Sequence, residues 1–445
     1  MTQDCIYALT SLSLAQKNVS ETQSCINSWR SAGLQVRAFN HPHEIRRLAR
    51  LYDVEFVPVT ETTAQIFGRH YIPIKAMLNW AAQQDAPALL INSDIYLQMA
   101  DWEMKRARWL STGGICYFIR YNHNGRITHA AREPYGIDAF LLHGRDAAYF
   151  PDSFLSMGQP FWDYWLPHMF TSRNCPVYAV EFPAAFHHTH PSGWSWENWH
   201  RCALEFVRMT GQLDGDQSFE ACVAMSVRVR QGFESKRVSI PQRPLPIKNW
   251  VQQTFRYPGA KLFIELGAHK GTDTAWIAAI PNVTIHAFEP DPRNHQAQRP
   301  NVYLYRAAIA DHDGSGSLIL SQWGWGQEWT HSSSIKQPKN HLQRFPVTFG
   351  GSVEVQLTAL DTFYRQHGLG TIDFIWADIQ GAEGEMIRGG QQALDHTRYL
   401  YTEYSDDEMY EGQVTLREIL ELLPDFRVLE LWPDDVLLEN RRLAA

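Results

Sequence analysis

Two acidic residues that follow buried apolar runs have the type and spacing needed for chemistry. Asp378 follows the run at residues 374–376, and Glu403 follows the run at 399–401. The carboxyl ends of neighbouring parallel strands meet at one edge of a sheet, so we expect these carboxylates to converge. Asp378 is predicted to be a general base for a substrate hydroxyl that receives a transferred group, because such a hydroxyl barely ionises at neutral pH without a base or a metal. Glu383 and Glu403 are predicted to orient the reactants or to bind a metal; for Glu383 a helix cap is the alternative.

A glycine-spaced turn within residues 261–291 predicts the seat of a nucleoside-bearing cofactor. Its sequence, ELGAHKG, runs from Glu265 to Gly271 after one apolar run, and a second apolar run ends at Glu289. In this strand, turn, helix and strand pattern the glycines let the backbone approach a ligand, and Glu289 accepts hydrogen bonds from ribose hydroxyls. Glu265 suits a ligand with an ammonium group and repels a pyrophosphate, as expected for S-adenosylmethionine. One alternative cofactor is a nicotinamide dinucleotide, although the middle glycine of the dinucleotide-binding motif is absent. Another interpretation is that these glycines serve only the packing of the fold.

An aromatic segment at residues 322–334 is predicted to bind the acceptor. Three tryptophans and two glycines within seven residues are typical of a flexible aromatic wall that stacks on sugar faces. His331 is predicted as an alternative base. A loop packed over the sheet edge is the other interpretation of this segment. The acceptor-binding residues expected here are Trp323, Trp325, Trp329 and Ser332.

Length and composition indicate a folded chain of about two or three domains. The 445 residues are 44% hydrophobic, and the net charge of -8 without a dense Lys/Arg block argues against a nucleic-acid surface. The six cysteines show no C-x-x-C spacing, which is typical of thiols in a reducing compartment. No apolar run approaches the roughly 18 residues of a membrane span. These features predict a soluble cytoplasmic protein whose partners are small molecules or neutral glycans.

The alternation of strand and helix patterns is interrupted at a proline-rich segment. Three prolines fall within residues 239–246, and neither a helix nor a central strand tolerates them. We therefore expect a first domain at residues 1–240, a linker at 241–247 and a second domain at 248–445.

The first domain resembles the GT-A type of nucleotide-sugar glycosyltransferase over about 150 residues. Its apolar strand that begins at Ala88 stops at Asp94, as at the Asp-x-Asp motif of that fold, although the first acid is missing. The resemblance implies a nucleotide sugar whose diphosphate is bridged by a divalent cation, Mn or Mg, on Asp94. It also implies an acceptor side where Asp138 and Asp163 act as base or sugar ligand. In the run HHTHP, His188 is predicted as a further metal ligand, with solvent-facing histidines as the alternative.

The second domain is similar to the FkbM family of S-adenosylmethionine-dependent methyltransferases over about 180 residues. Six blocks occur in the order and spacing of that family: ELGAHKG, HAFEPDP, YRAAIAD, LTALDTF, IDFIWADIQGAEGEMIRGG and YLYTEYSD. Family members usually have Asp at the position of Glu265 and Asn at that of His269. In the block usually written K-I-D-x-E-G-A-E, this chain has Trp376 for the lysine and Gln380 for the first glutamate. The resemblance places the cofactor on Glu265, Gly267, Ala268 and Gly271, its ribose on Glu289 and its adenine near Ala307 and Ala308.

Together these observations predict an α/β protein with two Rossmann-like domains. The first has a GT-A-like nucleotide-sugar transferase fold, and the second has a class I methyltransferase fold, a parallel sheet with one antiparallel edge strand. The resemblances imply an S-adenosylmethionine-dependent O-methyltransferase for a hydroxyl of a saccharide or glycosylated metabolite, with a first domain that adds or holds the sugar. The alternatives are a non-catalytic carbohydrate-binding protein and a NAD-dependent oxidoreductase. The sequence carries no signal for the oligomeric state.

Overall fold

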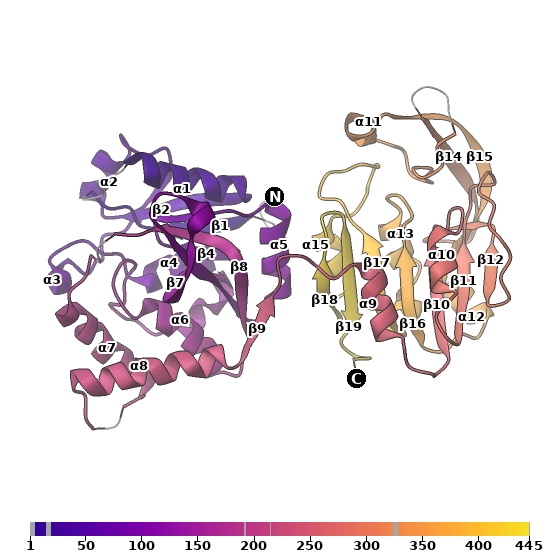
Figure 1. Ribbon diagram of the computed structural model, residues 1–445. Helices are drawn as coiled ribbons and strands as arrows, with labels where there is room; N and C mark the ends of the chain where they lie inside the picture. The colour runs from indigo at the N-terminus through magenta and orange to yellow at the C-terminus, as the bar shows by residue number, and fades with distance from the viewer. Residues whose placement is uncertain (1–4, 15–18, 191–192, 214, 324–327, 445) are drawn as a thin grey trace. The chain divides into compact units, whose positions relative to one another are not determined.

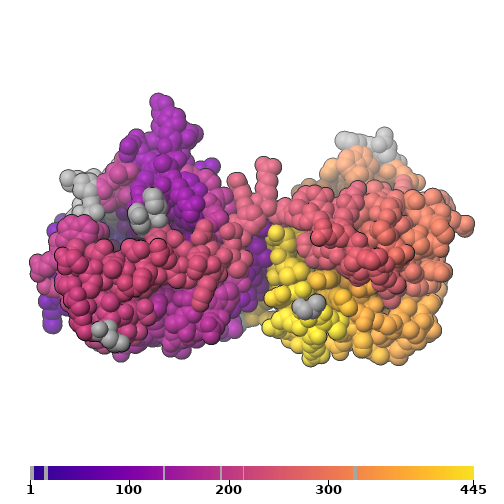
Figure 2. Space-filling model, turned by 60° about the horizontal axis from the view of Figure 1, so that its bottom comes forward, coloured from indigo at the N-terminus to yellow at the C-terminus, as the bar shows by residue number. Residues whose placement is uncertain are grey.

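The computed structural model of the chain describes residues 5–14, 19–190, 193–213, 215–323 and 328–444. The chain divides into two units, Met1–Arg243 (the N-terminal unit) and Pro244–Ala445 (the C-terminal unit), each with a sheet of its own (Figure 1). The division lies within the proline-rich segment 241–247. In the space-filling view the coral residues that follow the division and the yellow C-terminal residues belong to one body (Figure 2). The predicted α/β class with two Rossmann-like sheets is confirmed.

A nine-stranded sheet forms the centre of the N-terminal unit. Its strands are β1 (Ile6–Thr10), β2 (Leu34–Asn40), β3 (Glu55–Pro58), β4 (Pro87–Ile91), β5 (Ile95–Leu97), β6 (Ile115–His123), β7 (Ala131–His143), β8 (Val177–His188) and β9 (Arg237–Ile240). They are ordered β3-β2-β1-β4-β7-β6-β8-β5, and β9 pairs with β8. The first four strands pair in parallel, and β7 runs antiparallel to β4 and β6. The order reverses at β1, so a ligand is expected at the carboxyl ends of β1 and β4.

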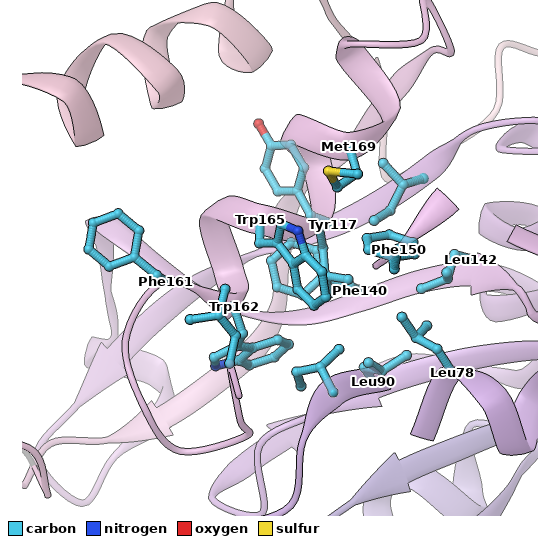
Figure 3. Packing of buried hydrophobic residues seen from close by; sticks show 14 of the residues in the cluster. Leu78, Leu90, Tyr117, Phe140, Leu142, Phe150, Phe161, Trp162, Trp165 and Met169 are labelled. Carbon is cyan, nitrogen blue, oxygen red and sulfur yellow. The ribbon is translucent and has the colours of Figure 1, made fainter. Parts of the chain in front are cut away.

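Helices cover both faces of this sheet. They are α1 (Val19–Ser31), α2 (Pro42–Leu48), α3 (Ala64–Phe67), α4 (Ile74–Gln84), α5 (Asp101–Leu110), α6 (Trp162–Thr171), α7 (Trp196–Thr210) and α8 (Phe219–Glu234), with short 3₁₀ turns at Ile127–His129 and Gly144–Tyr149. One apolar cluster joins α1 and α5 to the sheet, and a larger one joins α4, α6, α7 and α8 to it. In the larger cluster Trp165 meets Phe150 edge to face, with ring centroids 5.1 Å apart (Figure 3).

A seven-stranded sheet forms the centre of the C-terminal unit. Its strands are β10 (Lys261–Leu266), β11 (Val283–Phe288), β12 (Val302–Tyr305), β16 (Ile372–Ala377), β17 (Thr397–Glu403), β18 (Phe426–Leu431) and β19 (Asp435–Asn440), in the order β12-β11-β10-β16-β17-β19-β18. The five strands from β12 to β17 pair in parallel, and β19 is antiparallel to both of its neighbours. The antiparallel strand was expected at the edge, whereas it lies one position inside, because the last hairpin returns between β17 and β18. The order reverses at β10, which places the expected ligand site at the carboxyl ends of β10 and β16.

The remaining elements of this unit are short helices and a small second sheet. The helices are α9 (Ile247–Thr254), α10 (Thr272–Ile277), α11 (His341–Arg344), α12 (Leu360–Gln366), α13 (Glu383–Arg388), α14 (Gln391–Asp395) and α15 (Leu416–Leu422). The small sheet has the order β13-β15-β14, from β13 (Ala307–Ala310), β14 (Gly314–Trp323) and β15 (Val347–Ala359). Across the described ranges, no helix combines the length and apolar character that crossing a bilayer requires.

Candidate active site

The loops after β10 and β16 touch at the point where the strand order reverses. Gly267 follows β10 with a φ of 82°, and a Cβ atom there would lie 1.8 Å from the carbonyl oxygen of Asp378. Only glycine tolerates both this conformation and this approach. The backbone N–H of Asp378 in turn donates to the carbonyl of Leu266 at 2.9 Å. These contacts fix Asp378 beside the glycine turn.

A cavity of about 70 Å³ lies at these strand ends. Ala268 does not reach it, because this residue is buried in the core and its N–H donates to the carbonyl of Phe288 at 2.9 Å. Gly271 caps the start of α10, where a Cβ atom would lie 3.0 Å from Oε1 of Gln296. Ala268 and Gly271 therefore determine the conformation of the turn without lining the cavity. The predicted residues that do line the cavity are Gly267, Glu289, Ala307, Ala308, His331 and Asp378.

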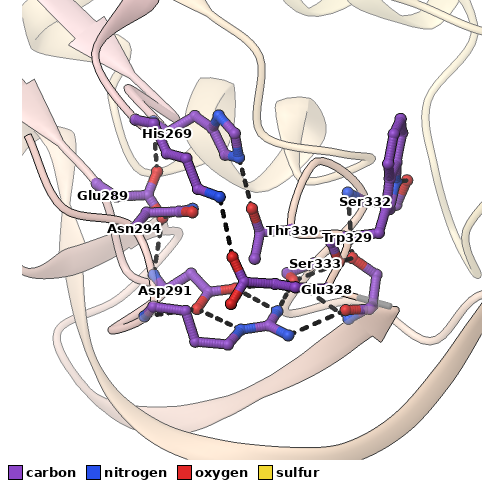
Figure 4. Close-up of polar contacts among 12 residues, drawn as sticks. His269, Glu289, Asp291, Asn294, Glu328, Trp329, Thr330, Ser332 and Ser333 are labelled. Carbon is purple, nitrogen blue, oxygen red and sulfur yellow. Dashed lines mark hydrogen bonds and ion pairs between the residues drawn. The ribbon is translucent and has the colours of Figure 1, made fainter. Parts of the chain in front are cut away.

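The carboxylate of Glu289 is held by three donors at the wall of this cavity (Figure 4). It accepts from the backbone N–H of His269 at 2.6 Å, from that of Asp291 at 2.8 Å and from Nδ2 of Asn294 at 3.0 Å. Burial raises its pKa, while these three hydrogen bonds act in the opposite direction. The side chain is thus oriented, and it links the glycine turn to the end of β11.

Glu265 points away from the cavity. It is buried beside the first turn of α10, where Thr274 donates to it, and its Oε2 has no hydrogen-bond partner among the described residues. Burial raises its pKa from 4.5 to about 8. The sequence predicted a direct cofactor contact for Glu265, but the structure places it where it stabilises the helix start.

Asp378 and Glu403 form a half-buried acid pair bridged by an amide. Their carboxyl groups are hydrogen-bonded to each other, and Nε2 of Gln380 donates to Oδ1 of Asp378 at 2.6 Å and to Oε2 of Glu403 at 3.1 Å. Burial raises the pKa of both acids, and the charge of Asp378 raises that of Glu403 further. The hydrogen bond between them raises the pKa of Glu403 and lowers that of Asp378, so Glu403 is the proton donor of the pair. Tyr410 supports the bridge, with its hydroxyl 3.1 Å from Oε1 of Gln380.

Two further acids lie near this pair, and of these Glu383 is buried and Asp435 is half-buried. Glu383 is the first residue of α13 and accepts the N–H of Gly381, ahead of the helix, at 3.3 Å, and burial raises its pKa to about 7. Asp435 is bonded to the hydroxyl of Tyr401, and burial raises its pKa to about 7 as well. The sequence analysis did not identify Gln380, Tyr410 or Asp435 as site residues. The only signal was Gln380 itself, a departure from the family block.

His331 lines the cavity, and Trp323 and Trp329 lie near it in the sequence. The rings of His331 and His269 are 3.9 Å apart, and Nε2 of His269 lies 2.6 Å from Oγ1 of Thr330. Burial lowers the pKa of His269 to about 4, so its ring is neutral. Trp329 packs on Trp323, with centroids 4.9 Å apart.

The side chain of Ser332, also predicted to contact the acceptor, is buried and accepts the indole N–H of Trp329 at 3.2 Å. The Ser332 hydroxyl is therefore oriented by Trp329 of the same segment. Trp325, the remaining predicted acceptor contact, lies outside the described residues.

A second cavity, of about 510 Å³, lies at the carboxyl ends of β1 and β4 in the N-terminal unit. Asp138 lines it and is held by Arg120 at 2.6 Å and by Nδ2 of Asn92 at 2.8 Å. Asp163 lines it too, and burial, followed by the charge of Asp138, raises the pKa of Asp163 to about 7. Trp194 also lines this cavity.

Asp94 lies in the same cavity, but His188 does not contact it. The ring of His188 bonds Glu21 at 2.7 Å, so the predicted pairing with Asp94 is corrected. The neighbours His187 and His190 occupy that place, with their Nε2 atoms 3.6 Å and 3.0 Å from Oδ2 of Asp94. Successive residues of a strand face opposite sides, which is why 187 and 188 cannot share one partner.

Residues 265–428 match the model of the methyltransferase FkbM domain. The 2-O-methyltransferase NoeI of Sinorhizobium fredii (strain NBRC 101917 / NGR234) is 37% identical over 234 residues, which cover 50% of this chain and 95% of that protein. The chain therefore belongs to the FkbM methyltransferase family. It is an S-adenosylmethionine-dependent O-methyltransferase, as the six sequence blocks predicted, and the nicotinamide alternative is dropped.

Two solved structures have more distant similarity. An rRNA methylase from Streptococcus thermophilus has 12% identity and a TM-score of 0.24, over 45% of this chain and 98% of that one. The mannose-1-phosphate geranyltransferase from Thermus thermophilus has 9% identity and a TM-score of 0.21, over 67% of this chain and 89% of that one.

Proposed function

We propose that this methyltransferase acts on a hydroxyl of a saccharide or glycosylated metabolite, with Asp378 as the base that takes the hydroxyl proton. The observation that carries the proposal is the acid pair, in which Glu403 is the hydrogen-bond donor and Asp378, which lines the cavity, is the acceptor. Bound S-adenosylmethionine supplies an activated methyl group. The protein must then align the acceptor oxygen and remove its proton.

The pKa shift of Asp378 suits this role. An ordinary aspartate is a weak base, whereas burial raises the pKa of Asp378 toward the operating pH, where proton transfer by a positioned group is most effective. The hydrogen bond from Glu403 lowers the pKa of Asp378. It therefore opposes the effect of burial and keeps Asp378 able to accept a proton. His331, which lines the same cavity, is the alternative base.

The cofactor seat is proposed to be the cavity between Gly267, Glu289 and the Ala307–Ala308 pair. The oriented Glu289 carboxylate suits two ribose hydroxyls, and the alanines leave room for an adenine ring. Ligand pockets usually measure about 300–1,000 Å³, so a cavity of about 70 Å³ must widen on binding. The contact between His269 and Thr330 holds one wall of this cavity, so we expect it to break when the cavity widens.

A saccharide acceptor is supported by two observations. The relative from Sinorhizobium fredii is named as a 2-O-methyltransferase, which implies an acceptor with numbered oxygens. Trp323 and Trp329 lie near the cavity-lining His331 in the sequence, and their aromatic faces can stack on a sugar ring.

The test is methyl transfer from labelled S-adenosylmethionine to an oligosaccharide panel, read by mass spectrometry. Asp378→Asn should lower kcat by about 10²–10⁴, because a neutral amide cannot accept the proton, and should leave S-adenosylhomocysteine binding in place. Glu421→Gln, at an exposed acid paired with Arg417, is the control and should keep full activity. Full turnover by Asp378→Asn would refute the assignment of the base. A wild-type enzyme that methylates other acceptors and no saccharide would refute the substrate class.

We further propose that the two units are separate functional domains and that the N-terminal unit binds a nucleotide sugar. Its large cavity at the reversal of strand order, lined by Asp94, Asp138 and Asp163, supports this. A unit that only holds the acceptor sugar is the alternative. Calorimetry with nucleotide sugars and with free oligosaccharides separates the two. A donor-binding unit should bind the nucleotide sugar, whereas an acceptor-holding unit should bind only the oligosaccharide.

A further inference from the structure

Arg293 connects two walls of the cavity in the C-terminal unit, although it does not line the cavity itself. Its guanidinium donates to both carboxylate oxygens of Asp291, from Nε to Oδ1 at 2.9 Å and from Nη2 to Oδ2 at 2.6 Å. Asp291 is buried and lines the cavity beside Glu289. A planar contact through two hydrogen bonds is the geometry in which arginine holds a carboxylate most firmly. Arg293 is therefore fixed to the wall on which the cofactor ribose is proposed to bind.

The remaining hydrogen bonds of Arg293 reach the aromatic segment at residues 322–334 and the residue just before it. Nη2 also donates to Oγ of Ser333 at 2.9 Å (Figure 4), and Nη1 donates to the carbonyl of Ser321 at 3.1 Å. The backbone N–H of Ser321 donates to Oγ of Ser333 at 3.2 Å, so these two serines are also joined to each other. Four of the five N–H groups of the guanidinium are used in this way.

Ser321 extends the network to Trp329. Its hydroxyl donates to the carbonyl of Trp329 at 2.8 Å and accepts the backbone N–H of Ser332 at 3.3 Å. The indole N–H of Trp329 donates in turn to the hydroxyl of Ser332 at 3.2 Å. Both serines are buried, so water does not compete for these bonds. The position of Trp329 thus depends on oxygen atoms that Arg293 holds.

The other contacts between the glycine turn and the aromatic segment are poorer links. Lys270 pairs with Glu328 at 2.9 Å, but both side chains are exposed, and an exposed ion pair contributes little. The contact between His269 and Thr330 is the one that we expect to break when the cavity widens. The bonds of Arg293 therefore remain as the connection between the cofactor seat and the aromatic segment.

We propose that Arg293 is a positioning residue that transmits occupancy of the cofactor seat to the aromatic segment. The cavity must widen to admit the cofactor, and when the wall with Asp291 moves, Arg293 makes Ser321 and Ser333 move with it. Trp329 then takes up its position for the acceptor only when the cofactor is bound. This step rests on the proposed function, in which the aromatic segment binds the saccharide. Because coupling between two binding sites is reciprocal, a bound acceptor in turn strengthens cofactor binding.

The first test follows Trp329 in the full chain by fluorine NMR, with fluorotryptophan in place of tryptophan. The signal of Trp329 is identified by its absence in Trp329→Phe. Titration with S-adenosylhomocysteine should shift this signal in the wild type. Arg293→Lys keeps the positive charge but not the planar fork. In this variant calorimetry should still show binding of S-adenosylhomocysteine, whereas the Trp329 signal should no longer shift.

Two further variants separate coupling from a general loss of structure. Ser333→Ala removes a contact to the aromatic segment but leaves the pair of Arg293 and Asp291 intact. It should likewise bind S-adenosylhomocysteine without a shift of the Trp329 signal. Glu328→Gln removes only the exposed pair with Lys270 and is the matched control, which should respond as the wild type does.

Acceptor affinity gives the second readout, with an oligosaccharide that the methylation panel identifies. S-adenosylhomocysteine should tighten its binding to the wild type by about 5–150-fold, the usual range for coupled sites, and Arg293→Lys should lose most of this gain.

Four results would overturn the coupling: a wild-type Trp329 signal that does not respond, a full shift in Arg293→Lys, equal acceptor affinity with and without S-adenosylhomocysteine, or loss of S-adenosylhomocysteine binding in both Arg293→Lys and Ser333→Ala. A panel in which no saccharide is methylated would refute the substrate class alone, because the fluorine signal needs only S-adenosylhomocysteine.

Discussion

Removal of the Gln380 amide tests the acid pair directly. Its Nε2 lies 2.6 Å from Oδ1 of Asp378, and this hydrogen bond lowers the pKa of Asp378 against the effect of burial. A hydrogen bond to a charged group contributes about 1.5–3 kcal/mol, and about 1.4 kcal/mol corresponds to one pH unit. Gln380→Ala should therefore raise the pKa of Asp378 by about one to two units.

The sign of the effect on rate follows from the role of the base. Asp378 must be ionised to accept a proton, so below its pKa the active fraction falls about tenfold for each unit by which that pKa rises. The acid limb of the kcat profile should move to higher pH by about one to two units, and activity should recover on the alkaline side. Gln380→Glu, which places a third carboxyl group between two acids, should move the limb in the same direction.

The assay is methyl transfer from labelled S-adenosylmethionine at saturating substrate, followed across pH for the wild type, Gln380→Ala and Gln380→Glu. Glu421→Gln serves again as the exposed control. An acid limb that stays in place or moves to lower pH in Gln380→Ala would refute the shared-proton reasoning. A uniform loss of kcat at every pH would mean that Gln380 only supports the local structure.

Two other expectations concern the turn after β10. Because burial raises the pKa of Glu265 from 4.5 to about 8, its contribution to stability is complete below pH 4.5 and is lost as the pH rises through about 8. Glu265→Gln should therefore flatten the fall of Tm between about pH 5 and about pH 9, and an unchanged slope would contradict the burial argument. Gly267→Ala should abolish S-adenosylhomocysteine binding in calorimetry and lower stability by more than about 1 kcal/mol, because its Cβ would meet the carbonyl of Asp378 at a φ of 82°. Normal binding by this variant would show that the turn relaxes.

Several features of the C-terminal unit could be predicted from local sequence patterns. The turn at Gly267 and the acid at the end of β16 could be placed because glycine spacing and apolar runs are properties of a few consecutive residues. The direction of the Glu265 side chain could not be placed. It depends on which face of β10 carries α10, and that is settled only when the helix packs on the sheet.

Contacts between distant residues explain what the sequence did not reveal. Tyr410 supports Gln380 from 30 residues away, and no local pattern links the two. Likewise His187 rather than His188 faces Asp94, because the register of β5 against β8 decides which residues of the strand point to one side. A shift of the register by one residue would exchange the two histidines, and the sequence alone gives no measure of that register.

The chain departs from the family block at Gln380 and Trp376, and the two departures together leave the formal charge of the block unchanged. Gln380 replaces an acid at a place where it contacts both Asp378 and Glu403, so the replacement removes a like charge from between these two acids. Trp376 replaces a lysine and packs on the ring of Tyr401, with centroids 4.5 Å apart. One negative and one positive charge are lost together, so the formal charge of the block is unchanged. Asp378 is the acid of this block that lines the cavity, where the proposed methyl transfer to a hydroxyl requires a base.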